Sequence, residues 1–263
     1  MELELTGKRA FVAGSSDGIG RAVAEGLAVE GAELMLCART EAKLEATAHA
    51  LRKHGAARVE FIAADLDRSA EIQRVLDRTL DAFGGMDILI TNNGGPNPGD
   101  FLSMTDEDWL GVYKRTLMSG IRLIRGLLPG MIERKWGRVI NITSISVKQP
   151  VPRLLLSNTF RAGVTGMAKT LSDEVSKHGV TVNNIAPGYI ATARQAQLFN
   201  DRAAAAGTTV DHIRDQLTAN IPMGRIGTPD EIAHLAVFLA SARSSYITGT
   251  TIQVDGGLFR GLM

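Results

Sequence analysis

The sequence predicts an α/β fold, built as one doubly wound domain with about seven parallel strands and helices on both faces of the sheet. Short, continuous apolar runs alternate with helical patterns from one end of the chain to the other. A glycine-rich turn follows the first run, and no Ser/Pro-rich linker or repeat divides the 263 residues. Continuous apolar strands separated by helices are typical of a parallel sheet that is covered on both faces.

The predicted strands are short runs rich in apolar residues, separated by segments with helical spacing. After the first run, Ile19, Val23 and Leu27 recur at every fourth position, and Gly31 ends that helix. A charged amphipathic helix that ends at Gly55 follows the second run. The predicted strands are residues 9–14, 33–38, 58–65, 86–91, 138–143, 180–185 and 250–254.

One long excursion, residues 191–227, interrupts this alternation after the sixth predicted strand. Its sequence has helical character and mixed charge. Ligands of open α/β sheets bind outside the carboxyl ends of the strands, and a segment at this place would cover them. We therefore expect residues 191–227 to form a substrate lid within a single domain of residues 1–263.

The bulk composition limits the class of protein. Lys and Arg number 29 and Asp and Glu number 28, so net charge gives no reason to expect nucleic acid or an anionic membrane as a partner. No apolar run approaches the length of a membrane span, and the N-terminus lacks the pattern of a signal peptide. Cys37 is the single cysteine, and the five histidines show no close-spaced ligand pair. We expect a soluble, cytoplasmic protein with no metal site.

The turn AGSSDGIG, residues 13–20, joins the first predicted strand to the first helix and is a candidate phosphate-binding site. Its glycines fall at Gly14, Gly18 and Gly20, where the missing Cβ permits tight turning and close approach of a ligand. The unpaired N–H groups and the positive dipole end of the following helix suit a pyrophosphate. The spacing G-x3-G-x-G differs from the common G-x-G-x-x-G fingerprint, so a purely structural turn stays an alternative.

This turn is the first of a series of motifs that continues along nearly the whole chain. The others are AADL at 63–66, TNNGG at 91–95, GRVINITS at 137–144, VNNIAPGYIAT at 182–192, GRIGTPDEIA at 224–233 and SYITGTTIQVDGG at 245–257. In this order they resemble the short-chain dehydrogenase/reductase family, most closely the branch that contains the 3-oxoacyl-carrier-protein reductases. The resemblance implies a Rossmann-type fold and hydride transfer between a nicotinamide cofactor and a small-molecule carbonyl or hydroxyl group. It also implies a homotetramer, built through helices near 105–132 and 157–178 and the C-terminal strand.

The end of the second predicted strand bears on which dinucleotide binds. An acidic residue there would hydrogen-bond the ribose 2′-OH, whereas a nearby Arg favours a 2′-phosphate. Ala38 stands where NAD-preferring members of the family carry the acid, and Arg39 and Thr40 follow. We therefore expect NADP(H) rather than NAD(H), with the alternative that Arg39 lies on the adenine face or in solvent.

The resemblance implies further residues of the cofactor site. Asp65 resembles the family residue that touches the adenine ring, and Asn92 resembles the one that supports the cofactor end of the fourth strand. The expected cofactor residues are Gly14, Ser16, Gly18, Ile19, Gly20, Arg39, Thr40, Asp65, Leu66, Asn92, Gly94, Arg161, Pro187, Gly188, Ile190 and Thr192.

The catalytic positions of the family are altered in this chain. In the family a Tyr protonates the substrate oxygen, and a Lys four residues later lowers the pKa of that Tyr and binds the ribose. A Ser holds the oxygen, and an Asn joins a proton relay. The Ser is present as Ser144, but Ser157, Arg161 and Thr116 stand at the Tyr, Lys and Asn positions. A serine hydroxyl is a much weaker acid than a phenol, and Arg essentially does not release a proton. Arg161 can still bind ribose hydroxyls, while Ser157 either takes part in an altered site or only caps its helix.

Alternatives therefore remain both for the proton donor and for the function of the protein. Water held by Ser144, Ser157 and Arg161 is one candidate donor, and Lys148, Tyr189, Tyr113 and His212 are the others. The favoured function is an NADP(H)-dependent oxidoreductase acting on a carbonyl/alcohol pair. The alternatives are a non-catalytic NADP(H)-binding sensor or partner protein, and a non-redox enzyme in which Arg161 grips a carboxylate or phosphate of the substrate.

Overall fold

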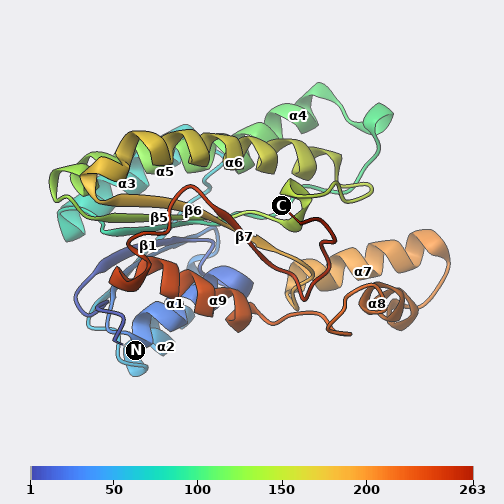
Figure 1. Ribbon diagram of the computed structural model, residues 1–263, viewed down its shortest axis with the longest axis horizontal. Helices are drawn as coiled ribbons and strands as arrows, with labels where there is room; N and C mark the ends of the chain where they lie inside the picture. Colours follow the sequence, from blue (N-terminus) through green and yellow to red (C-terminus); the bar gives the residue numbers. More distant parts are fainter. Residues whose placement is uncertain (1, 263) are drawn as a thin grey trace.

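The computed structural model describes residues 2–262 and confirms the doubly wound α/β architecture (Figure 1). Seven parallel strands form one sheet in the order β3-β2-β1-β4-β5-β6-β7. Each predicted strand overlaps an observed one, with ends that differ by two residues at most. The strands are β1 (Arg9–Ala13), β2 (Glu33–Ala38), β3 (Val59–Ala63), β4 (Ile88–Thr91), β5 (Gly137–Ile142), β6 (Val180–Pro187) and β7 (Thr251–Val254).

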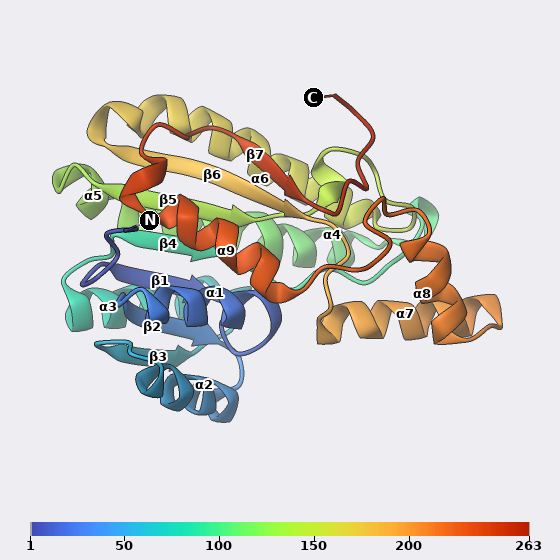
Figure 2. The ribbon, with the colours of Figure 1, turned by 60° about the horizontal axis from the view of Figure 1, so that its bottom comes forward.

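Helices cover both faces of this sheet. Helices α1, α2 and α9 pack on one face, and α3, α5 and α6 pack on the other (Figures 1 and 2). The helices are α1 (Gly18–Val29), α2 (Glu41–Lys53), α3 (Ser69–Phe83), α4 (Asp106–Val112), α5 (Ser119–Glu133), α6 (Leu155–Val175), α7 (Ala193–Ala206), α8 (Val210–Thr218) and α9 (Pro229–Ala240). Among residues 2–262, no helix combines the length and the apolarity needed to cross a bilayer.

The two-sided covering explains why the strands read as unbroken apolar runs. In β1, Ala10 and Val12 join the core beneath α1 and α9, while Phe11 and Ala13 join the core beneath α3 and α5. Successive side chains of a strand point to opposite faces, and here each face is buried under helices. An alternating apolar and polar pattern would therefore have placed polar side chains in a core.

The strand order places a crevice at the carboxyl edge of the sheet. The chain moves outward from β1 to β2 and β3, and outward in the opposite direction from β4 to β7. Such a reversal separates the loops that follow the two central strands and creates a ligand crevice between them. Helices α7 and α8, which lie within the predicted lid of residues 191–227, sit beyond this carboxyl edge (Figure 2).

A π-helical segment, Tyr113–Met118, joins α4 to α5 and interrupts the helix that the sequence predicts near 105–132. Two of its carbonyl groups accept hydrogen bonds from a loop residue. Asn93 Nδ2 donates to the carbonyl oxygens of Arg115 at 3.1 Å and Thr116 at 3.4 Å. Single π-turns are often found at functional sites. This one joins the loop after β4 to the helices beneath the sheet.

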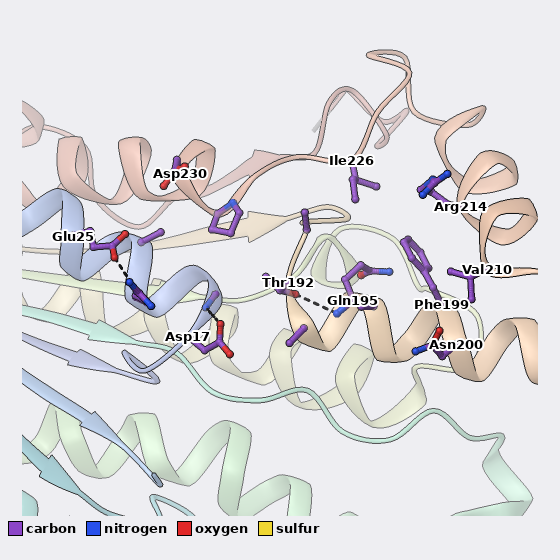
Figure 3. Close-up of a pocket in the computed structure, with 17 residues that line it drawn as sticks. Asp17, Glu25, Thr192, Gln195, Phe199, Asn200, Val210, Arg214, Ile226 and Asp230 are labelled. Atoms are coloured by element: carbon purple, nitrogen blue, oxygen red, sulfur yellow. Dashed lines mark hydrogen bonds and ion pairs between the residues drawn. The ribbon is translucent and has the colours of Figure 1, made fainter. Parts of the chain in front are cut away.

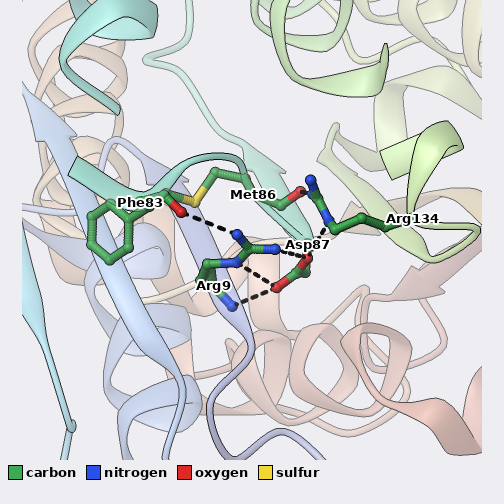
Figure 4. Close-up of polar contacts among 5 residues, drawn as sticks. All are labelled: Arg9, Phe83, Met86, Asp87 and Arg134. Atoms are coloured by element: carbon green, nitrogen blue, oxygen red, sulfur yellow. Dashed lines mark hydrogen bonds and ion pairs between the residues drawn. The ribbon is translucent and has the colours of Figure 1, made fainter. Parts of the chain in front are cut away.

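At the opposite edge of the sheet, one carboxylate ties three elements together. Arg9 donates to both Asp87 oxygens, at 2.9 and 2.7 Å, and Arg134 Nε donates to Asp87 Oδ1 at 3.1 Å (Figure 4). Arg9 also donates to the carbonyl oxygen of Phe83 at 3.0 Å. Burial alone would raise the pKa of Asp87, but the hydrogen bonds and charge of Arg9, with the charge of Arg134, hold it below its usual value.

Replacing this carboxylate should destabilise the fold in a pH-dependent way. We expect Asp87→Asn to lower the free energy of unfolding at pH 7 by about 3 kcal/mol, because two guanidinium groups lose a largely buried partner. The lowered pKa means that this stabilisation is complete above the unfolded value near 3.8 and is lost as pH falls through the lower folded value. Urea unfolding from neutral to acidic pH measures the difference between the two proteins.

The matched control is Asp77→Asn on the exposed face of α3, which should leave the free energy of unfolding nearly unchanged at every pH. The Asp87→Asn deficit should shrink as the wild-type carboxyl becomes protonated. A deficit that stays constant well below the ordinary carboxyl pKa would contradict the ionic role of Asp87.

Candidate functional site

A cleft of about 690 Å³ opens at the carboxyl edge of the sheet. Its lining includes every predicted cofactor residue except Gly20, and three of the four predicted catalytic positions, namely Ser144, Ser157 and Arg161. The fourth, Thr116, does not line the cleft. The sequence therefore identified residues that are brought to one place by six different strand ends and by α6, while their roles toward a cofactor stay predictions.

The glycine turn is built for close approach. Gly14 and Gly18 have φ values of +64° and +54°, which side-chain-bearing residues rarely adopt. A Cβ at Gly14 would lie 2.6 Å from Asn92 Nδ2, and one at Gly20 would lie 2.2 Å from the Gly14 carbonyl oxygen. Gly20 thus shapes the turn from below without lining the cleft. The turn and the start of α1 fit the pyrophosphate of a dinucleotide, because backbone N–H groups can approach it without side chains in between.

The end of β2 presents an uncompensated cation to the cleft. Arg39 is exposed, lines the cleft and makes no ion pair or hydrogen bond within residues 2–262. Ala38 beside it carries no carboxylate that would repel a phosphate. Lys43 also lines the cleft. Its Nζ lies 3.4 Å from Asp17 Oδ2, so the carboxylate of the glycine turn partly balances its charge. These residues fit a 2′-phosphate on an adenosine ribose better than a free 2′-OH.

The guanidinium of Arg161 points at backbone carbonyl groups. Its Nη1 donates to the carbonyl oxygens of Ile142 and Thr143, both at 3.0 Å, and its Nη2 donates to the carbonyl and side-chain oxygens of Asn93 at 3.4 Å. Burial lowers the pKa of Arg161 to about 10, so the group still carries its charge at neutral pH. Arg161 therefore ties α6 to the ends of β4 and β5, and any contact with a ribose would be additional to this.

Two hydroxyl groups form the polar centre of the cleft. The Ser144 Oγ accepts a hydrogen bond from the Ser146 N–H at 3.1 Å, which leaves its own proton free for donation. Ser157, on the first turn of α6, is 5% exposed and makes no hydrogen bond within the described chain. Thr116 Oγ1 is buried in the π-helical segment, likewise without a partner there. The structure thus brings Ser144 and Ser157 together at the cleft and leaves Thr116 outside it.

Of the other candidate proton donors, Tyr189 alone lines the cleft. Tyr113 is 38% exposed and lies against Phe160, with ring centroids 6.2 Å apart. His212 contacts Gln216 on α8, and Lys148 is half-buried outside the cleft lining. Tyr189 is therefore the alternative donor that the geometry supports. No group of three His, Cys, Asp or Glu residues suited to a metal ion occurs in the part of the chain described, residues 2–262.

Sequence reasoning missed several arginines of the cleft. Arg115 Nε forms an ion pair with Asp67 at 2.9 Å, and Arg194 Nη2 donates to the Pro96 carbonyl oxygen at 2.6 Å. Arg202 lies over the ring of Tyr189, 5.9 Å from its centroid. Helical spacing within residues 191–227 could have grouped Arg194 with neighbours on one face. Which face turns toward the cleft depends on contacts far away in the sequence.

A second groove, of about 600 Å³, lies on the other side of α7 (Figure 3). It runs between α1 and α7–α8, and Phe199 and Arg214 are among the residues that line it. Thr192 and Gln195 line both the groove and the cleft, and the Gln195 N–H donates to Thr192 Oγ1 at 3.2 Å. The start of α7 is thus a wall between two open spaces.

The Arg161 geometry leads to a stability prediction. We expect Arg161→Met to lower the free energy of unfolding by about 1–3 kcal/mol, because buried carbonyl groups lose their donor. Arg161→Lys should lower the free energy of unfolding by a smaller amount, since a single ammonium group cannot make all the hydrogen bonds of a planar guanidinium. Chemical denaturation measures both, with Arg125→Met on exposed α5 as the control. Equal stability of Arg161→Met and wild type would show that the carbonyl contacts contribute nothing.

Comparison with known proteins identifies the family. A family model described as enoyl-(acyl carrier protein) reductase matches residues 13–259. The 3-oxoacyl-[acyl-carrier-protein] reductases of Vibrio cholerae and Escherichia coli are 35% and 34% identical to this chain, each over 257 residues that cover 98% of this chain and 99% of theirs. L-sorbose reductase from Gluconobacter frateurii, solved with NADPH and L-sorbose, matches with a TM-score of 0.95 and 34% identity over 100% of both chains. A variant of actinorhodin polyketide ketoreductase, solved with NADPH, matches with a TM-score of 0.91 and 31% identity, covering 96% of this chain and 97% of that one. The chain therefore belongs to the short-chain dehydrogenase/reductase family of oxidoreductases, and within it is similar to the 3-oxoacyl-acyl-carrier-protein reductases.

Proposed function

We propose that this protein is an NADP(H)-dependent oxidoreductase that interconverts a carbonyl compound and its alcohol through an altered proton-transfer site. The observation that carries the proposal is the cleft itself, which joins a glycine cradle and the free cation of Arg39 to the hydroxyls of Ser144 and Ser157. Similarity to reductases along the full chain supports an enzyme over a sensor or a non-redox catalyst. The solved neighbours that contain NADPH support the choice of cofactor.

The cofactor would be held by residues from both sides of the crevice. The glycine turn and the N-terminus of α1 would take the pyrophosphate, and Arg39 with Thr40 would take the 2′-phosphate. When bound, the cofactor supplies or accepts the hydride. The backbone of residues 187–192 would border the nicotinamide. Gly188 permits this path, because a Cβ there would lie 2.8 Å from the Asp255 Cα.

In the direction of reduction, the substrate oxygen must gain a proton as its carbon gains a hydride. Ser144 would donate a hydrogen bond to that oxygen and orient it. A water molecule held by Ser157 would deliver the proton, and the hydroxide left behind would take up a proton from solvent through the open cleft, so that carbonyl, hydride and proton give the alcohol. The fixed charge of Arg161 lies close behind and favours negative charge on the oxygen. Tyr189 is the alternative donor, since it lines the same cleft.

Residues 191–227 would act as a lid over this reaction. The hydrogen bond from Arg194 to the Pro96 carbonyl oxygen holds α7 against the loop that follows β4.

The predicted homotetramer also belongs to this proposal. Phe101 and Leu102, just before α4, are 68% and 96% exposed, and large apolar side chains that face water are common where chains associate.

The cofactor preference can be tested at Arg39. We expect Arg39→Gln to weaken NADPH binding by about tenfold to hundredfold and to leave NADH binding unchanged, because only NADPH carries the 2′-phosphate. Lys53→Gln, which removes an exposed cation at the far end of α2, is the matched control and should change neither affinity. Isothermal titration calorimetry with both cofactors measures the effect. Parallel losses for NADPH and NADH, or none, would refute the role of Arg39.

The altered proton-transfer site can be tested with NADPH oxidation in the presence of a panel of ketones, ketoses and 3-oxoacyl thioesters. We expect Ser144→Ala to lower kcat by about 10²–10³-fold, through loss of an oxyanion donor, and Ser157→Ala to lower it by about 10²-fold. Thr159→Ala on the exposed face of α6 is the control and should keep full activity.

Two outcomes would count against this mechanism. Tight NADPH binding without turnover of any panel member would favour a sensor protein over an enzyme. Full activity of Ser157→Ala, together with loss of activity in Tyr189→Phe, would move the proton donor from the Ser157-held water to Tyr189.

A further inference from the structure

The cleft is divided by charge in a way that the sequence does not reveal. Its carboxylates, Asp17, Asp65 and Asp67, all come from the turns after β1 and β3, where the adenosine end of a dinucleotide would lie. The part formed by the loops after β4, β5 and β6 and by α6 and α7 contains Arg161, Arg194 and Arg202 and no carboxylate. The lid is mixed in charge as a sequence, yet its carboxylates at 201, 211 and 215 are exposed outside the cleft lining.

The arginines of this second part differ in how far their charges are already used. Arg161 is occupied by the carbonyl groups at the ends of β4 and β5. Arg194 donates to the Pro96 carbonyl oxygen. Arg202 makes no hydrogen bond or ion pair within residues 2–262. Its guanidinium carbon lies over the face of the Tyr189 ring, 5.9 Å from the ring centroid. Arg202 is thus a half-buried cation without an anion in a cleft region that lacks carboxylates.

We propose that Arg202 binds an anionic group of the substrate, so that the protein acts on small carbonyl compounds, or the corresponding alcohols, that carry a carboxylate or a phosphate. The inference rests on the proposed oxidoreductase function and names its substrate class. A guanidinium binds either group with two parallel hydrogen bonds. The Tyr189 ring beneath Arg202 limits its motion, which lowers the entropy lost when the anion binds.

The position of Tyr189 links the anion to the reaction centre. Tyr189 follows the Pro187–Gly188 pair at the end of β6, and it lines the cleft together with Ser144 and Ser157. A substrate whose anion contacts Arg202 would therefore extend its other end toward these two hydroxyls. Binding energy from a remote charged group of this kind can hold a carbonyl in a reactive orientation.

The test uses matched ligands that differ in charge. Acetoacetate, levulinate and 5-oxohexanoate are compared with their methyl esters, and dihydroxyacetone phosphate is compared with dihydroxyacetone. Calorimetry on the protein saturated with NADP⁺, which cannot reduce the ketones, gives each Kd, and NADPH oxidation gives kcat and KM. The acids and the phosphate distinguish the two kinds of anion, and the three chain lengths sample the distance between anion and carbonyl.

The variants are Arg202→Gln, Arg202→Lys and the control Arg214→Gln. Arg214 lies on α8 in the second groove, paired with Asp211 at 2.9 Å, so its loss removes the same charge from the same lid outside the cleft (Figure 3). We expect at least one anionic ligand to bind about tenfold or more tighter than its neutral partner. Arg202→Gln should remove that advantage, with a rise in Kd and KM of about tenfold to hundredfold and a smaller change in kcat. Arg202→Lys should restore part of it, and Arg214→Gln should match wild type.

Several results would overturn the inference. Equal binding of acids and esters, or no binding of any anion in the panel, would exclude Arg202 as an anion site. Weaker NADPH binding in Arg202→Gln would assign the residue to the cofactor pyrophosphate instead. Turnover of neutral and anionic ketones alike would defeat the inference and leave the oxidoreductase function standing. Arg202-dependent anion binding without any turnover would support the anion site and count against the oxidoreductase function.

Discussion

The reversal of strand order between β1 and β4 is the constraint on which the rest of this molecule depends. Chain connections leave the two central strands in opposite directions along the sheet, so the loops after them separate at the carboxyl edge. At the floor of the crevice the loops still touch, since a Cβ at Gly14 would lie 2.6 Å from the Asn92 amide nitrogen. Gly14 is therefore required for two reasons: the turn needs its positive φ, and the neighbouring loop leaves no room for a side chain. The parallel arrangement then brings every later strand end to the same edge.

Arg161 sets the shape of the other half of this edge. A guanidinium can reach the carbonyl groups of two consecutive residues at once, and here it also reaches Asn93 in the neighbouring loop. Asn93 in turn holds the π-helical segment through the carbonyls of Arg115 and Thr116. The Arg161 side chain thus links α6, two strand ends and, through Asn93, the π-helical segment before α5. Because these partners are neutral oxygens, the positive charge is not cancelled and acts on the cleft.

The fold, and the gathering of the proposed cofactor residues in one cleft, could be predicted from the sequence because their signals are local. Buried strands are continuous apolar runs, and the glycine turn marks the first crossing from strand to helix. The predicted cofactor residues lie in short motifs that directly follow strands, so finding the strands also locates the residues. Gly20 departs from the cleft lining for a local reason as well, since it packs on the Gly14 carbonyl beneath the turn.

The contacts of the arginines and the place of Thr116 in the reaction half of the cleft could not be predicted, because they depend on distant partners. Arg161 takes its direction from carbonyl groups 18, 19 and 68 positions away in the chain. The π-turn that removes Thr116 from the cleft is stabilised by Asn93, 23 positions away. Helical periodicity places Arg202 on a face of α7, but the face that turns toward the cleft is fixed by how α7 packs. The lid sequence is mixed in charge, but the charged side chains that the lid contributes to the cleft lining are all positive.

In the proposed reaction, the role of the Ser157 hydroxyl and the surplus of cations in the cleft can be understood together. Reduction of a carbonyl places negative charge on oxygen, and a catalyst either protonates that oxygen as charge develops or stabilises the charge until a proton arrives. Ser157 cannot do the first, because its hydroxyl is too weak an acid. Arg161 suits the second, because its pKa of about 10 keeps it charged at neutral pH and burial strengthens its field. In the proposed reaction the proton can then come late, from water, and the acid strength of Ser157 matters less than the water it holds. In the proposed reaction such a centre favours anionic substrates and disfavours cationic ones, so proton transfer and the choice of substrate both depend on the same excess of positive charge.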